Sequence, residues 1–200
     1  KEHSERGYLG AMETYHAKVA ELAQIGVDLM HPEGGPPFMV RGHKAEQEIV
    51  SGWEEKYKIP IFTSGMSQAQ ALRALGIKKF VGCTYFRDQK MNDVFSRYFT
   101  DSGFEVLGME GMDTSPGEAD TISTETIYQH LKASFNKHPK AQGIYLLGSG
   151  AWGIKDIVTA ENDLGVPVLH PVAARVWYVQ KLLRIKNPLK GASRLLEELP

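Results

Sequence analysis

The stretch IKKFVGCT, residues 77–84, decides how this sequence is expected to fold. Its apolar run is typical of a strand that is buried on both faces of a parallel sheet. On either side of it, helical and strand-like segments alternate along the chain, which is typical of βα units. We therefore predict an α/β fold in which a parallel sheet is flanked by helices.

The remaining elements follow from hydrophobic spacing and from the glycines and prolines that end each segment. The predicted helices cover residues 8–24, 42–57, 66–75, 88–102, 121–136, 152–164 and 171–186. The predicted strands besides 77–84 cover residues 27–30, 59–62, 104–107, 143–147 and 165–169. Residues 108–120, rich in Gly, Asp, Ser and Pro, are expected to be irregular.

Two halves of the chain share one cadence, because in each a strand ends in a glycine-rich turn that opens a helix. The turns are Gly34-Gly35 and Gly148-Ser149-Gly150. We predict two pseudo-symmetric lobes, each a parallel sheet flanked by helices, with the active site in the cleft between them. The first lobe is expected to comprise residues 1–76 and 171–200, and the second lobe residues 77–170.

Composition excludes several classes of function. Lys and Arg number 23 against 24 Asp and Glu, with both signs scattered, which argues against a nucleic-acid partner or an anionic membrane surface. No run of 18 apolar residues could span a membrane, and the polar first residues do not form a signal peptide. The single cysteine, Cys83, excludes internal disulfides and fits a cytoplasmic protein. No spacing indicates a metal site or a Walker loop.

Ligands of open α/β sheets bind beyond the carboxyl ends of the strands, where loops meet helix N-termini. The loops 31–37, 63–65, 84–88 and 148–152 qualify. They offer backbone N–H groups, the phenol of Tyr85 and the hydroxyls of Thr63, Ser64, Thr84 and Ser149. Such groups suit a small carboxylate, although glycine-rich turns at these places are also ordinary features of α/β proteins. Both interpretations stay open on spacing alone.

Acid–base candidates also stand at strand ends. His31 and Glu33 flank Pro32, and His170 precedes Pro171. Each is either a catalytic acid or base or a solvated loop residue. Cys83, inside the strand 77–84, is expected to be a buried core residue rather than a nucleophile.

Three segments carry a resemblance to a known family. They are Leu72–Gly76 with Ile77–Val81, Gly143–Gly150 with Leu164–Val168, and Phe38–Gly42 after the Gly34-Gly35 turn. In order and spacing they resemble the aspartate/glutamate/hydantoin racemase superfamily, closest to its arylmalonate decarboxylase and maleate isomerase branch. The resemblance covers about residues 7–185. The family's opening strand has no counterpart here, so we expect that the chain is incomplete or lacks that segment.

The resemblance implies two lobes around a site that holds a carboxylate with amides and hydroxyls, without a metal or an organic cofactor. Racemases and the isomerase use a cysteine from each lobe, whereas arylmalonate decarboxylase keeps the second alone. These positions fall on Gly34 or Gly35 and on Gly148, so neither is cysteine in this chain. Tyr85, or its neighbour Phe86, matches the tyrosine that binds the anion.

The leading hypothesis is therefore a cofactor-independent, decarboxylase- or isomerase-like enzyme that acts on a small mono- or dicarboxylate by a route without the cysteine pair. Ser149, Tyr85, His31, Glu33 or His170 would have to replace the cysteines. A carboxylate-binding relative without catalysis, and a hydrolase with a water activated by His31 or Glu33, are the alternatives. A small carboxylate is the expected partner, and a homo-oligomer stays open.

Overall fold

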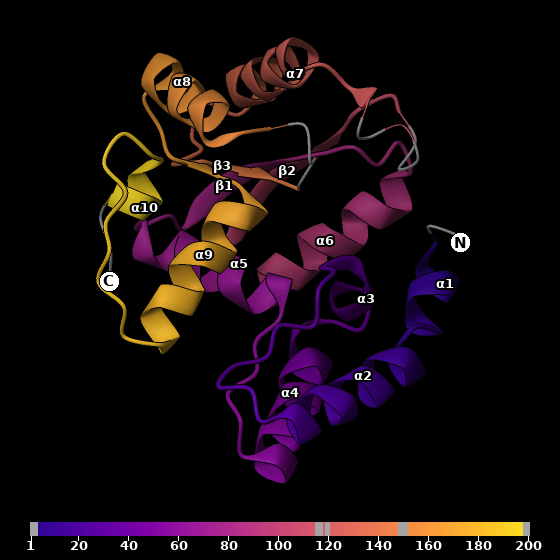
Figure 1. Cartoon of the computed structure of the whole chain (residues 1–200). Coiled ribbons are helices and arrows are strands. Elements are labelled where there is room, and N and C mark those ends of the chain that lie inside the picture. Colours follow the sequence, from indigo (N-terminus) through magenta and orange to yellow (C-terminus); the bar gives the residue numbers. More distant parts are fainter. Residues whose placement is uncertain (1–3, 115–117, 119–120, 148–151, 198–200) are drawn as a thin grey trace.

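A computed structural model describes residues 4–114, 118, 121–147 and 152–197 of the chain (Figure 1). Its sheet has four parallel strands in the order β2-β1-β3-β4. The strands are β1 (Lys79–Thr84), β2 (Glu105–Gly111), β3 (Ile144–Leu146) and β4 (Val168–Leu169). The predicted α/β class is thus observed, with the strand of residues 77–84 at an inner position.

Helices cover both faces of this sheet (Figure 1). On one face lie α7 (Thr124–Lys137) and α8 (Ile154–Leu164). On the other face lie α5 (Ser64–Ala74), α6 (Gln89–Asp101) and α9 (Pro171–Leu182). Because side chains alternate along a strand, Phe80 of β1 packs towards α5 and α6, whereas Val81 and Cys83 pack towards α7 and α8.

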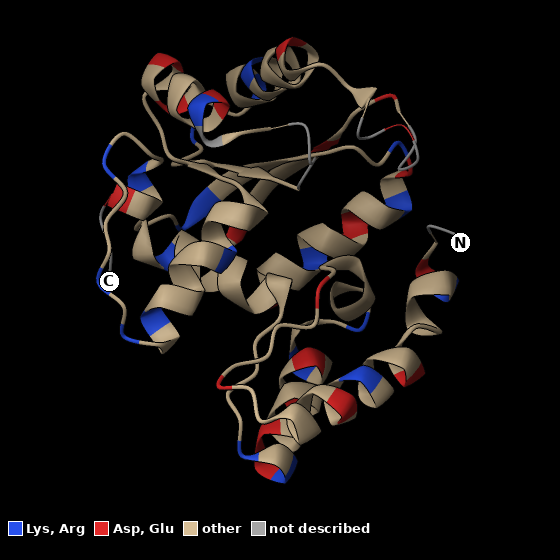
Figure 2. Cartoon of the chain, in the orientation of Figure 1, with Lys and Arg blue, Asp and Glu red and all other residues tan. Residues whose placement is uncertain are grey.

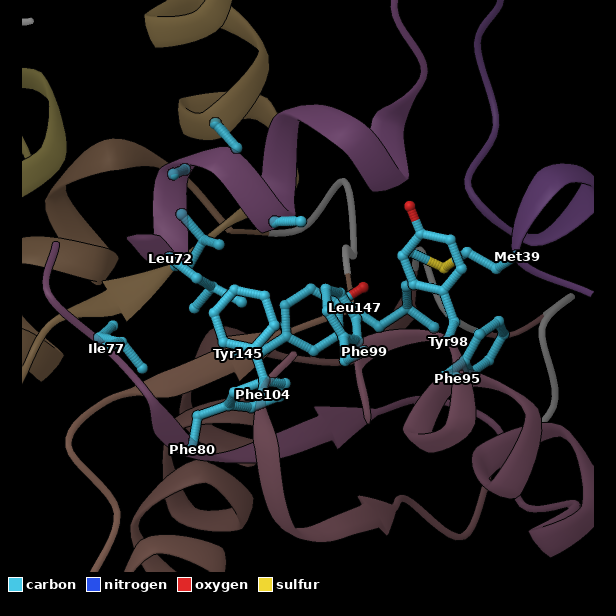
Figure 3. Packing of buried hydrophobic residues seen from close by; sticks show 14 of the residues in the cluster. Met39, Leu72, Ile77, Phe80, Phe95, Tyr98, Phe99, Phe104, Tyr145 and Leu147 are labelled. Atoms are coloured by element: carbon cyan, nitrogen blue, oxygen red, sulfur yellow. The ribbon is translucent and has the colours of Figure 1, made fainter. Parts of the chain in front are cut away.

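An aromatic cluster fills the face of the sheet under α5 and α6 (Figure 3). The rings of Phe99 and Tyr145 meet edge to face with centroids 4.7 Å apart, and Phe80 meets Phe99 at 5.3 Å. Such packing buries large apolar areas and fixes ring orientation. It holds α5 and α6 at set positions relative to the strand ends.

A second apolar cluster lies outside this sheet. It is formed by α2 (Met12–Ile25), by α3 (Pro36–Met39), by α4 (His43–Tyr57) and by an isolated parallel bridge between Met30 and Ile61. The short α1 (Glu5–Leu9) precedes it, and α10 (Arg194–Glu197) contacts α9. α9 packs on α5. The boundaries of the two predicted lobes stay a prediction.

Four predicted features differ from the structure. The strands expected over 27–30 and 59–62 are reduced to the Met30–Ile61 bridge, because Pro32 and Pro60 have no N–H to extend a ladder. The helix expected from residue 8 is broken at Gly10 and Ala11, between α1 and α2. The expected loop at Pro36 forms the single turn α3, since proline suits the first helical positions. β2 extends to Gly111, into the stretch expected to be irregular.

Charged residues of both signs are interspersed along the outer helices (Figure 2). Within the described part of the chain, no helix is long and apolar enough to cross a membrane.

Candidate functional site

The first turn of α5 is the best-defined element at the predicted site. Thr63 is its N-cap, with extended backbone, and its Oγ1 accepts a hydrogen bond from the N–H of Met66 at 3.1 Å. This cap places Ser64 at the first position of an 11-residue helix, directly after the Met30–Ile61 bridge. The first N–H groups of a helix have no partner within it, so this turn can receive an anion.

His31 lies beside this turn, fixed by contacts at both ring nitrogens. Nδ1 donates to the carbonyl oxygen of Phe62 at 2.9 Å, and the imidazole stacks on the Phe62 ring with centroids 4.5 Å apart. Nε2 lies 3.1 Å from Oε2 of Glu33 and 3.5 Å from Oγ of Ser64. Because a carbonyl and a carboxylate can only accept, the form that satisfies both contacts is the imidazolium, in which both nitrogens donate.

Glu33 joins this group through two cationic side chains. Its Oε2 accepts from His31 and also from Nη1 of Arg175, which α9 brings from far along the sequence. The hydrogen bond from His31 first, and the positive charge of Arg175 next among the favourable causes, lower the pKa of Glu33. We call His31, Glu33, Ser64 and Arg175 the His31 cluster. Glu33 is therefore an ionised anchor for two cations.

The Gly34-Gly35 turn borders the same cluster. Gly34 has φ +109°, and a side-chain carbon there would lie 2.8 Å from the phenol oxygen of Tyr15. At Gly35 an added carbon would lie 3.8 Å from Cβ of Ser64, so the turn approaches the start of α5. Glycine permits both the positive φ and the close approach. Gly35 opens α3, which is one turn long, not the extended helix that the sequence led us to expect.

Thr84 and Tyr85 lie at the end of β1. The Thr84 hydroxyl is buried; it donates to Oδ1 of Asn92 at 2.6 Å and accepts from the N–H of Phe86 at 3.2 Å, so it holds its own loop. Tyr85 is half-buried and stacks on Phe86. Its phenol is close enough to contribute to the raised pKa of Tyr145, after burial.

Tyr145 links this end of β1 to α5. Its hydroxyl donates to Oε1 of Gln68 at 3.0 Å, and Gln68 lies one turn after Ser64 on α5. The structure thus brings His31, Glu33, Gly34-Gly35 and Ser64 together, with Thr63 behind them and Tyr85 connected through Gln68 and Tyr145.

The other predicted site residues take different places. His170 is buried and caps α9, where its Nδ1 accepts from the N–H of Val172 at 3.2 Å. Cys83 is fully buried as expected, and burial raises the pKa of its thiol to about 12. Gly148, Ser149 and Gly150 lie outside the described residues. Among the described residues, no three His, Cys, Asp or Glu side chains are grouped to hold a metal ion.

Sequence reasoning missed two parts of this site. Arg175 is separated from Glu33 by 142 residues, and no local pattern marks it. Glu46, on α4, is completely buried, and its Oε1 accepts from the Thr63 hydroxyl at 2.5 Å. Its Oε2 accepts from the phenol of Tyr98 on α6. We call Glu46, Thr63 and Tyr98 the Glu46 cluster. A carboxylate inside an otherwise amphipathic helix was the one available signal.

Comparisons with known proteins agree with this fold. The family model described as arylmalonate decarboxylase matches residues 1–196. A crystal structure of arylmalonate decarboxylase superposes with a TM-score of 0.86 at 22% identity, over 96% of this chain and 84% of that chain. No curated protein matches this chain in sequence.

Two maleate isomerases are similar as well. The maleate isomerase Iso from Pseudomonas putida S16 has a TM-score of 0.85 at 18% identity, over 97% of this chain and 80% of that chain. The maleate cis-trans isomerase of Nocardia farcinica bound to TRIS has a TM-score of 0.81 at 19% identity, over 94% of this chain and 79% of that chain. At these identities the likenesses establish the fold alone. They confirm the predicted α/β class, and the two-lobe layout is consistent with them.

Proposed function

Because this chain belongs to the arylmalonate decarboxylase family, we propose that it is a lyase or isomerase that acts on a small carboxylate, with His31 in place of a cysteine as the group that transfers the proton. The observation that carries this proposal is the pair of oxygen acceptors facing the two ring nitrogens of His31. They favour a charged imidazolium beside the first turn of α5.

A thiol route does not suit this chain. A maleate cis-trans isomerase from Nocardia farcinica has been captured with a covalently bound succinylcysteine intermediate, so that enzyme uses a cysteine. The single cysteine of this chain is 0% exposed inside the sheet, and its pKa is raised to about 12. A buried thiol that stays protonated and has no access to solvent cannot meet a substrate. Another group must therefore supply the proton.

His31 has the chemistry for that step. In a decarboxylation, the bond to the departing carboxylate breaks, carbon dioxide leaves, and its electron pair stays on the neighbouring carbon. That carbanion then takes the proton from Nε2 of His31, and solvent protonates the imidazole again. Proton transfer by a positioned histidine contributes about 10²- to 10⁴-fold to a rate. Glu33 would act by holding the imidazolium in place.

The remaining carboxylate of the substrate would bind at the start of α5. The free N–H groups there, the Ser64 hydroxyl, the backbone of Gly34-Gly35 and the positive charge of Arg175 favour an anion. Tyr85 and the segment Gly148-Ser149-Gly150 complete the proposed site from the second lobe. We keep the residues of this segment as proposed ligands, with Ser149 also a candidate catalytic residue.

Activity measurements test this directly. Arylmalonates are assayed for release of carbon dioxide and maleate for isomerisation, with His31→Gln compared with His130→Gln, a matched substitution on α7. We expect His31→Gln to lower kcat by about 10²- to 10⁴-fold with little change in KM, and His130→Gln to have no effect.

Full activity of His31→Gln would remove His31 from the mechanism. Tight binding of small carboxylates without turnover in a broad panel of mono- and dicarboxylates would instead support the binding relative without catalysis.

A further inference from the structure

We infer that Glu46 is a positioning residue of the carboxylate site: through Thr63 and the first turn of α5 it couples the binding of an anion to the uptake of a proton on its own carboxyl group. This inference rests on the proposed function, because it assigns the anion to the start of α5. It adds a group that touches no substrate.

The geometry of the Glu46 cluster supports this coupling. Glu46 and Thr63 are each 0% exposed, so neither can exchange its partner for water. The Thr63 hydroxyl donates its one hydrogen to Oε1 of Glu46 and receives the N–H of Met66 on its lone pair. One hydroxyl thus ties the carboxylate to the cap of α5. The phenol oxygen of Tyr98, which points away from the Phe95 ring in Figure 3, supplies the second bond.

The carboxylate lies immediately behind the helix start. A side-chain carbon added at Gly65 would lie 3.0 Å from Oε1 of Glu46 and 2.7 Å from Cζ of Tyr98. The first turn of α5 therefore separates Glu46 from whatever binds on the side of Ser64 and His31. A negative charge on Glu46 and an anion at the same turn repel each other across this thin layer.

Protonation changes the direction of the hydrogen bonds. An ionised carboxylate can only accept, so the hydroxyls of Thr63 and Tyr98 both point at it. When Glu46 takes a proton, one of its oxygens becomes a donor, and the hydroxyl opposite must turn its own hydrogen elsewhere. The repulsion of an incoming anion disappears in the same step. Anion binding and protonation of Glu46 are therefore expected to favour each other, and thermodynamic linkage makes the effect reciprocal.

The surroundings of Glu46 let it titrate in an accessible range. Burial is the largest cause that raises its pKa, to about 7, and the hydrogen bonds from Thr63 and Tyr98 oppose this rise. Within the described residues, its printed hydrogen bonds come from neutral hydroxyls and from no cation. The tyrosine on α6 is itself influenced by Arg73 of α5 and by Tyr145 of β3.

Three further elements pack against α4 or its neighbours. His43, at the start of α4, meets the Tyr98 ring edge to face at 5.5 Å. α2 directs His16 at Trp53, seven residues beyond Glu46 on α4, and α3 consists of Pro, Phe and Met without a titratable side chain. Across the α5 turn, the His31 cluster titrates independently of Glu46. A substitution at Glu46 is therefore needed to separate the two contributions to any pH profile.

Isothermal titration calorimetry provides the test. Maleate and phenylmalonate are titrated into the wild-type chain from pH 5.5 to 8.5, in two buffers of different ionisation enthalpy that report the protons taken up. We expect the affinity to fall about 5- to 20-fold as pH rises through 7, with proton uptake on binding above that pH. Glu46→Gln is expected to lose this component and to bind at pH 8 about as tightly as the wild type binds at pH 6.

Tyr98→Phe is the second variant, and it keeps the carboxyl group. Because it removes one hydrogen bond that favours the ionised form, it should move the midpoint of the affinity profile to higher pH, which a purely structural role of the cluster would not do. Circular dichroism checks that each variant is folded. If Glu46→Gln or Tyr98→Phe keeps the wild-type pH profile, this inference is wrong while the proposed function stands. If neither anion binds at any pH, the proposed function fails, and this inference fails with it.

Discussion

Glu33 and Glu46 both lie beside the first turn of α5, yet their carboxyl groups are shifted in opposite directions. The Glu33 side chain is 61% exposed, and its pKa is lowered. Glu46 is 0% exposed, and its pKa is raised to about 7. Each accepts two side-chain hydrogen bonds, but those of Glu33 come from His31 and Arg175, whereas those of Glu46 come from neutral hydroxyls. The charge of the partner, together with burial, decides whether a carboxyl group anchors cations or titrates near neutrality.

The largest expected effect concerns the pH dependence of stability. A raised pKa means that ionised Glu46 is disfavoured in the folded state, so its contribution favours folding at low pH and is lost as pH rises from about 4.5 through about 7. A shift from 4.5 to about 7 corresponds to about 3 kcal/mol. In urea unfolding from pH 4 to 8, Glu46→Gln should remove this fall in stability relative to the wild type. Parallel pH profiles of the two proteins would contradict the buried, titrating state of Glu46.

A second variant separates burial from pairing at Cys83. Its thiol is fully buried, and burial is the main cause that raises its pKa. Cys83→Ser places a more polar group in that apolar site and should cost about 1–3 kcal/mol of unfolding free energy, with carboxylate binding retained. Chemical denaturation and calorimetry measure the two quantities. Fast alkylation of the native thiol with loss of activity would instead restore a role for the cysteine.

The smallest effect is expected at Glu33, because its side chain is largely exposed to solvent. Glu33→Gln should reduce stability at pH 7 by less than about 1 kcal/mol. Since the Glu33 pKa is lowered, the contribution of the pair is present above the ordinary pKa of a carboxyl group and disappears as pH falls below it. Urea unfolding at pH 7 and pH 3 measures this. A loss of several kcal/mol would mean that Glu33 carries the fold, not the site.

The sequence predicted the parallel sheet because long apolar runs and regular glycine stops are local signals. The strand of residues 77–84 and the helix of residues 42–57 are confirmed within about two residues of β1 and α4. It predicted too much strand at residues 27–30 and 59–62, where Pro32 and Pro60 limit the ladder to one bridge. The family resemblance was confirmed, whereas the assignment of its cysteine positions to Gly34 or Gly35 and Gly148 stays a prediction.

The sequence by itself determined the fold class, the position of Ser64 at a helix start and the burial of Cys83, since each depends on neighbours within a few residues. Only the tertiary structure decided which groups meet. Arg175 reaches Glu33 because α9 packs on α5, and Glu46 meets Tyr98 because α4 packs on α6. The ionisation of a carboxyl group depends on the charges and the solvent within a few ångströms, and those neighbours come from distant segments that only packing brings together.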